Sequence, residues 1–138
     1  MYCSNFYKNI IIFYIKYDIN FIFCNHPLYQ RKVVEDYEVE YQEAGLHHSC
    51  ALFSYEDLER GKLSLFGEEI SGLTIYPGWM TKPEMYSDFY TLLEQKGIYL
   101  INTPEEYERY HTLPGWYDDF ADETAQSVWE TEGNVENA

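Results

Sequence analysis

The stretch LTIYPGWMTKPEMYSDFYTLLEQKGIYLIN, residues 73–102, predicts a strand, a helix and a second strand in direct succession. Its first four residues are apolar, β-branched or aromatic and run into a Pro-Gly pair, which is typical of a strand that ends in a turn. Thr81, with Glu84 three positions later, has the pattern of a helical capping box, and Pro83 suits the first helical turn.

The helix of this stretch carries an apolar stripe at a spacing of three to four residues. The stripe consists of Met85, Phe89, Leu92 and Leu93. Gly97 suits the end of the helix, and residues 98–101 have the composition of a second buried strand. Two strands joined by a helix of this length form a parallel pair with a right-handed crossover. We therefore expect an α/β fold, a Rossmann-like, open, mainly parallel sheet flanked by helices.

The remaining chain divides into further elements on each side of this stretch. Strands are expected at residues 20–24 and 50–53, and helices at residues 33–44, 54–60 and 103–111. Loops or turns are expected at residues 25–32, 62–72 (a hairpin-like excursion) and 113–117, and another strand would begin at residues 127–129. The pair Thr103 and Glu106 repeats the capping-box pattern, with Pro104 between them.

These elements form one domain, residues 20–131. Residues 1–19 are a poorly defined N-terminal extension, which is either an extra edge strand or an upstream segment counted as coding. Their apolar run is far shorter than the ~20 residues that a membrane helix needs, and no signal cleavage site follows it. Residues 132–138 have no periodicity, so we expect an acidic, frayed tail.

The composition excludes several classes of function. Asp and Glu number 24 against 9 Lys and Arg, which gives a net charge of −15. Phosphate backbones and anionic membranes repel such a surface, so neither nucleic acid nor a membrane is an expected partner. The three cysteines are an odd number without CxxC spacing, which favours a reducing, cytoplasmic setting and no disulfide framework. Cys24 and Cys50 are expected to be small core residues.

No catalytic signature occurs in the chain. The patterns GxGxxG, GxxxxGK[ST], HExxH and GxSxG are all absent, so we expect no catalytic residue, no cofactor site and no metal site here. His47 and His48 are adjacent, which favours solvent exposure over metal binding. The acid pairs of residues 118–119 and 122–123 are interpreted as a solvated face.

The first candidate for a binding site is the predicted loop after the first strand. His26 and Arg31 lie there, between the carboxyl end of a strand and the start of a helix, a place that suits anions. The alternative is that Arg31 and Lys32 only pair with Glu35 and Asp36 nearby.

The second candidate is the turn of residues 76–81. Open parallel sheets bind ligands beyond the carboxyl ends of their strands, so Tyr76, Trp79 and Met80 are candidate substrate contacts. The alternative is that Trp79 and Met80 belong to the core. The two candidate segments together would form one wall of a cleft.

Three stretches taken in order resemble a known family. They read HPLYQRKVVEDYEVEYQEA, YPGWMTKPEMYSDFYTLLEQKGIYLINTPEEYERYH and LPGWYDDFADETAQSVW. They are similar to the amino-terminal part of ATP-grasp proteins, and most similar to the predicted amide-ligase clade named for two arginines and a lysine. The resemblance covers residues 20–131, which in such proteins form a Rossmann-like pre-ATP-grasp domain.

The resemblance implies a role in ATP-dependent carboxylate–amine ligation. In such enzymes ATP and Mg²⁺ are held by the ATP-grasp subdomains, and this chain ends before them. The resemblance therefore implies a truncated or split gene product that is inactive alone and needs those subdomains or a partner chain. The chain also departs from the family pattern, in which an aspartate often replaces His26 and an arginine replaces Pro77.

Two other interpretations remain. The first is a stand-alone acidic module that binds another protein, for example an inhibitor that mimics a polyanion. The second is a small enzyme of unrelated chemistry, which the absent motifs disfavour. For the ligase interpretation, we expect apolar area to be exposed on the last strand and around Trp116 and Trp129.

Overall fold

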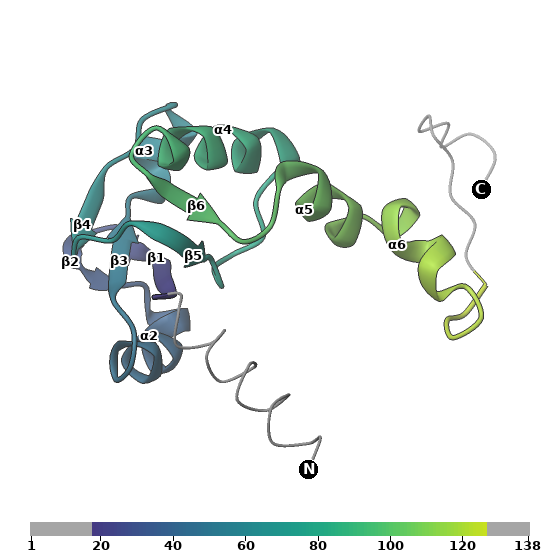
Figure 1. Cartoon of the computed structure of the whole chain (residues 1–138), viewed down its shortest axis with the longest axis horizontal. Helices are drawn as coiled ribbons and strands as arrows, with labels where there is room; N and C mark the ends of the chain where they lie inside the picture. Colours follow the sequence, from purple (N-terminus) through teal and green to yellow (C-terminus); the bar gives the residue numbers. More distant parts are fainter. Residues whose placement is uncertain (1–17, 127–138) are drawn as a thin grey trace, which may run out of the picture.

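A sheet with helices on both sides forms the centre of the computed structural model, which describes residues 18–126 (Figure 1). The strands are β1 (Asn20–His26), β2 (Tyr29–Val33), β3 (Cys50–Phe53), β4 (Leu65–Gly67), β5 (Gly72–Ile75) and β6 (Ile98–Leu100). The helices are a 3-10 turn (Glu35–Tyr37), α2 (Glu38–Gly45), α3 (Tyr55–Glu59), α4 (Pro83–Glu94), α5 (Pro104–His111) and α6 (Leu113–Phe120).

The strand order is β4-β3-β1-β5-β6, and β2 pairs with the end of β1. Strand β1 runs parallel to β3 and β5, and β5 runs parallel to β6, whereas β4 is antiparallel to β3 at one edge. The predicted α/β class with an open, mostly parallel sheet is confirmed.

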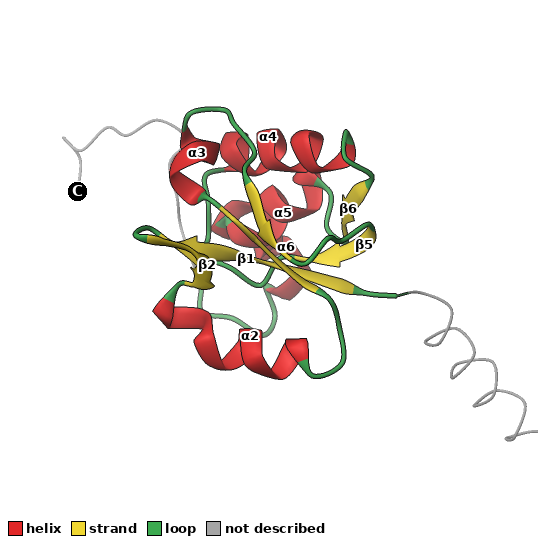
Figure 2. Ribbon diagram, turned by 90° about the vertical axis from the view of Figure 1, so that its left-hand side faces the viewer, coloured by secondary structure: helices red, strands yellow, loops and turns green. Residues whose placement is uncertain are grey.

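The two faces of the sheet bury different side chains because successive residues of a strand point in opposite directions. On β1, Ile22 and Cys24 belong to one core, and Phe23 belongs to the other. Helices α3 and α4 cover the first face and α2 covers the second (Figure 2). The sheet is therefore the middle of three layers.

The predicted strand–helix–strand unit is present as β5, α4 and β6. Phe89 and Leu93 of α4 are fully buried, as their place in the apolar stripe predicts. Gly97 has φ of 75°, which favours glycine after a helix end. The predicted capping box was wrong. The N-cap is Lys82, without a side-chain cap, and the buried Thr81 instead donates its backbone N–H to Tyr107 Oη at 2.8 Å.

The region after β1 differs most from its prediction. Residues 25–32 are not a loop and no helix begins at residue 33, because β1 continues to His26 and forms an antiparallel hairpin with β2. The hairpin buries Val33 against Phe23 and Leu52. The helix therefore starts only at Glu38, and it ends at Gly45, one residue beyond the predicted end.

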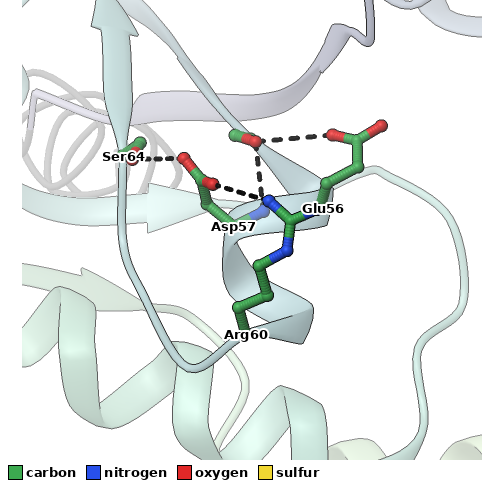
Figure 3. A network of polar contacts seen from close by, with 5 residues as sticks. Glu56, Asp57, Arg60 and Ser64 are labelled. Carbon is green, nitrogen blue, oxygen red and sulfur yellow. Dashed lines mark hydrogen bonds and ion pairs between the residues drawn. The ribbon is translucent and has the colours of Figure 1, made fainter.

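Helix α3 forms where Ser54 and Asp57 predict it. Ser54 Oγ accepts the Asp57 backbone N–H at 3.2 Å, and the Asp57 carboxylate accepts Ser64 Oγ–H at 2.6 Å and lies 3.7 Å from Arg60 (Figure 3). These contacts hold the chain that leads into β4. The predicted hairpin-like excursion was wrong here, because Leu65 and Phe66 pair with β3 and make β4 an edge strand of the sheet.

Helix α5 has the complete capping box that Thr103 and Glu106 predict. The expected loop at residues 113–117 was wrong, because these residues belong to α6. Gly115 packs so closely on the backbone of Arg109 that no side chain would fit there, and Arg109 also binds both carboxylate oxygens of Asp119. Figure 1 shows α6 beyond α5, away from the sheet.

Several predictions lie outside the described residues. They concern residues 1–17 of the N-terminal extension, the strand at residues 127–129, the face around Trp129 and the tail at residues 132–138. Within residues 18–126, no helix has the length and apolarity that crossing a bilayer requires.

Candidate functional site at the carboxyl edge of the sheet

The carboxyl ends of β1 and β5 meet at the centre of the sheet. The chain places β3 on one side of β1 and β5 on the other, so the strand order reverses beside β1. In open α/β sheets, ligands bind at such a reversal, beyond the carboxyl ends of the strands. The turn of residues 76–81 leaves β5 at this point.

Trp79 lies at this reversal and is held by three side chains. Its Nε1–H donates to Asp36 Oδ2 at 3.0 Å. Its ring meets the ring of Tyr37 edge-on at a centroid distance of 6.4 Å and the ring of Tyr55 at 5.9 Å. The turn after β5 is therefore tied to the segment after β2 and to α3.

Tyr76 holds the same turn from the side of the core. Its hydroxyl donates to the carbonyl oxygen of Trp79 at 2.8 Å, and its ring packs edge-on against Phe53 and Phe89. The ring lies so close to Gly78 that a Cβ at that position would overlap it. Burial is the main cause that raises the pKa of Tyr76, so this hydroxyl stays protonated.

Two buried thiols lie in the cores of the sheet, Cys24 near the carboxyl end of β1 and Cys50 at the start of β3, on the opposite face. Cys24 Sγ is 3.7 Å from Tyr76 Oη. The tyrosine gives its one proton to Trp79, so the thiol is the donor of this contact. Burial raises the pKa of Cys24 to about 12, and burial raises the pKa of Cys50 to about 11. Neither thiol is a ready nucleophile, because the reactive form is the thiolate.

The structure brings only part of the predicted site together. Tyr76 and Trp79 contact each other in one turn, and Met80, which follows them, is 67% exposed. His26 is the last residue of β1, and its Nδ1 accepts the Leu28 N–H of the following turn at 3.1 Å. No described contact joins His26 to the turn after β5.

Arg31 lies on β2 and is exposed to solvent. It borders a hollow with Phe66, Glu68 and Lys96, and none of the residues that line this hollow belongs to the turn after β5. Lys32 does pair with Glu35, at 3.9 Å, whereas Arg31 has no ion-pair partner among residues 18–126. The expected single cleft wall from both segments is not formed by these contacts.

The residues that hold Trp79 were missed from the sequence. Asp36 was considered only as a partner of Arg31 or Lys32, and Tyr37 and Tyr55 are two of 15 tyrosines in the chain. No local spacing links them to Trp79, because the hydrogen bond from Trp79 to Asp36 spans 43 positions of the chain.

One buried polar atom near this edge lacks a hydrogen-bond partner. Asn25, near the end of β1, is 5% exposed and donates its Nδ2–H to the Gln30 carbonyl oxygen at 3.4 Å. Its Oδ1 has no hydrogen-bond partner in the part of the chain that the structure describes. No three His, Cys, Asp or Glu side chains of residues 18–126 lie close enough to hold a metal ion. Among residues 18–126, the edge thus offers mainly aromatic surface, from Tyr76 and Trp79.

Comparison with known proteins gives no match. No protein-family model, no curated protein and no solved structure matches this chain. The resemblance to ATP-grasp proteins therefore stays a prediction from the quoted residues.

Proposed function

We propose that this chain is a pre-ATP-grasp-type domain, a non-catalytic α/β domain that serves ATP-dependent carboxylate–amine ligation. Nucleotide-binding subdomains, from a partner chain or from another part of a longer protein, would dock against it and hold ATP and Mg²⁺. A cytoplasmic location is part of the proposal, because Cys24 and Cys50 are free thiols, which suits a reducing compartment.

The last strand of the sheet carries this proposal. Strand β6 is an edge strand, with only β5 beside it among the described strands. Tyr99 on this strand is 47% exposed, and Ile101 just after it is 53% exposed. Apolar side chains on an open sheet edge suit a surface that another domain covers.

The carboxyl edge agrees with a domain that does not hold the nucleotide itself. Phosphate groups need a glycine-rich loop or a helix N-terminus with free N–H groups at this place. Here the loop after β1 is a hairpin, and the turn after β5 is closed by Trp79 and Tyr76. Tyr76, Trp79 and Met80 remain the proposed substrate-side contacts.

The first test is calorimetric titration of the chain alone with ATP and Mg²⁺. We expect no heat of binding. A micromolar dissociation constant would contradict the proposal, since the chain would then hold a nucleotide site of its own.

The second test is a search for the nucleotide-binding subdomains that the proposal requires. A reading frame beside the gene that encodes ATP-grasp subdomains is expected, and its product should form a complex with this chain that hydrolyses ATP. Tyr99→Lys should weaken that complex by about tenfold or more, since it places a charge in the contact. Tyr29→Lys is the matched control, an exposed tyrosine on β2, and should have no effect. An isolated gene would favour the stand-alone alternative.

A stand-alone acidic module is the second candidate function. The exposed carboxylates of α2, at Glu38, Glu40 and Glu43, favour it because no basic residue stands in the first or last turn of this helix. Salt-sensitive binding to a basic protein, lost when these three residues become Gln, would support it.

A further inference from the structure

A small cavity lies beside Tyr76, on the side of the carboxyl edge toward β6. Its volume is about 150 Å³, and it is the most enclosed of the hollows described in residues 18–126. Four elements contribute to its wall, namely the end of β5, α4, the end of β6 and α5. The residues that matter here are Tyr76, Tyr86, Ile101, Asn102, Tyr107 and His111.

Stacked rings form one wall of this cavity. The ring of Tyr86 stacks on Tyr107 at a centroid distance of 3.7 Å, and Tyr107 stacks on His111 at 3.9 Å. The faces of Tyr107 are therefore covered by its two neighbours. The stack is fixed at both hydroxyls, since Tyr86 donates to the Asn102 carbonyl oxygen at 2.9 Å and Tyr107 binds the backbone of Thr81.

His111 supplies the two side-chain nitrogens of the stack, and the hydrogen bond of one of them decides the tautomer. Its Nδ1 lies 2.8 Å from the carbonyl oxygen of Tyr107. A carbonyl oxygen can only accept, so Nδ1 carries the proton and Nε2 of the neutral ring has a free lone pair. Nε2 has no partner among the described residues, and His111 is an exposed residue at the wall of the cavity, so Nε2 is open both to water and to a molecule bound there.

The residues that line the cavity favour an uncharged ligand. No Asp, Glu, Lys or Arg lines the cavity. A charged molecule would lose its hydration there without gaining an opposite charge, which is unfavourable. The volume is that of a cavity that holds about one benzene ring.

We propose that this cavity binds a small uncharged aromatic molecule with one hydrogen-bond donor, which it gives to Nε2 of His111. Phenol is the simplest member of this class. The ring of the ligand packs beside Tyr76 and Ile101, and the hydroxyl points to the histidine. This site does not depend on the proposed role in ligation, because it uses neither ATP nor a second domain.

The test is an NMR titration of the full chain with phenol and with toluene, which has the same shape and no donor. We expect saturable shifts of the backbone amides of Gly78, Ile101 and Asn102, with a phenol dissociation constant on the order of 1 mM. Toluene should bind about tenfold more weakly, because it lacks one hydrogen bond.

Two variants make the test specific. His111→Phe keeps a ring on Tyr107 but removes the acceptor, so phenol should bind it only as weakly as toluene does. His47→Phe makes the same change at an exposed histidine that does not line the cavity, and should leave both titrations unchanged. The proposal is overturned if phenol causes no saturable shift at these amides, if phenol and toluene bind the unaltered chain equally, or if His111→Phe leaves phenol binding intact.

Discussion

Two regions at the carboxyl edge share Tyr76 and are filled in opposite ways. Toward β1, Trp79 meets Tyr37 and Tyr55 edge-on, at 63° and 79°, and its N–H has a carboxylate partner. Toward β6, Tyr86, Tyr107 and His111 lie nearly parallel, at 6° and 20°, beside a cavity. Trp79 is thus held between two rings that meet it edge-on, whereas in the stack the faces of Tyr107 are covered and the cavity lies beside the rings. The same type of residue thus closes one region and leaves the other open.

Removal of the shared residue should have the largest effect. Tyr76→Ala deletes a ring packed on Phe53 and Phe89 and leaves the Trp79 carbonyl oxygen without its donor. We expect the free energy of unfolding to fall by about 3–5 kcal/mol. Urea denaturation measures it, with Tyr29→Ala, an exposed tyrosine, as the control. A loss below about 1 kcal/mol would contradict the packing described.

The stacked region can be tested at one hydroxyl. Tyr107→Phe keeps the stack but leaves the buried Thr81 N–H without an acceptor. An unpaired buried donor lowers the free energy of unfolding by about 1–3 kcal/mol. Tyr110→Phe, at a tyrosine that is 54% exposed, is the control and should change it by less than about 0.5 kcal/mol. Equal effects of the two substitutions would mean that the Thr81 bond is not made in solution.

Because Cys24, beneath Tyr76, has a raised pKa, we expect the stability of the chain to depend on pH. The pKa of Cys24 is raised from its ordinary 9.0 to about 12 in the folded chain. The unfolded state therefore loses its thiol proton first, so stability is complete below the unfolded pKa and falls as pH rises through it. From about pH 8 to about pH 10 we expect a loss of about 1 kcal/mol from this thiol.

The control for this prediction is Cys24→Ala. Cys50 also has a raised pKa, so the variant should keep part of the fall in stability. Identical pH profiles of the two proteins, measured by urea denaturation at each pH, would show that Cys24 is not the group responsible.

The smallest effect on the free energy of unfolding is expected in the region around Trp79. Trp79→Phe keeps an aromatic ring between the two tyrosines but loses the donor to Asp36. This bond is exposed, so its coupling should be only about 0.5 kcal/mol. A double-mutant cycle with Asp36→Ala measures it, and strictly additive losses would indicate that the bond contributes nothing. Asp36→Asn keeps an acceptor and should behave like the unaltered chain.

Predictions that rest on residues close together in the sequence were correct, whereas contacts between residues far apart in the sequence overturned others. The unit of β5, α4 and β6 was predicted correctly, because its strand runs, apolar stripe and Gly97 act within a few residues. The capping box of Thr103 and Glu106 was correct for the same reason. The matching pattern at Thr81 failed, since Tyr107, 26 positions away, takes the Thr81 N–H.

The hairpin of β1 and β2 shows the opposite case. The sequence at residues 33–44 has helical spacing, yet Val33 pairs with Asn25 and packs against Phe23. Burial of Val33 in the second core outweighs the weak helical preference of its neighbours. For the candidate site, Tyr76 and Trp79 were identified by their place after a strand. Arg31 was included because residues 25–32 were predicted to be a loop, whereas they belong to the β1–β2 hairpin.

The sequence alone determined the α/β class, the parallel β5–β6 pair, the acidic surface and the absence of the known phosphate-loop and catalytic motifs. These properties depend on composition and on neighbours within one helical turn or one strand. Only the tertiary structure decided that β2 joins β1, that Asp36 holds Trp79, and that a cavity lies beside Tyr107 and His111. Each of these depends on side chains from separate elements that meet in space, and a local pattern carries no information about such a meeting.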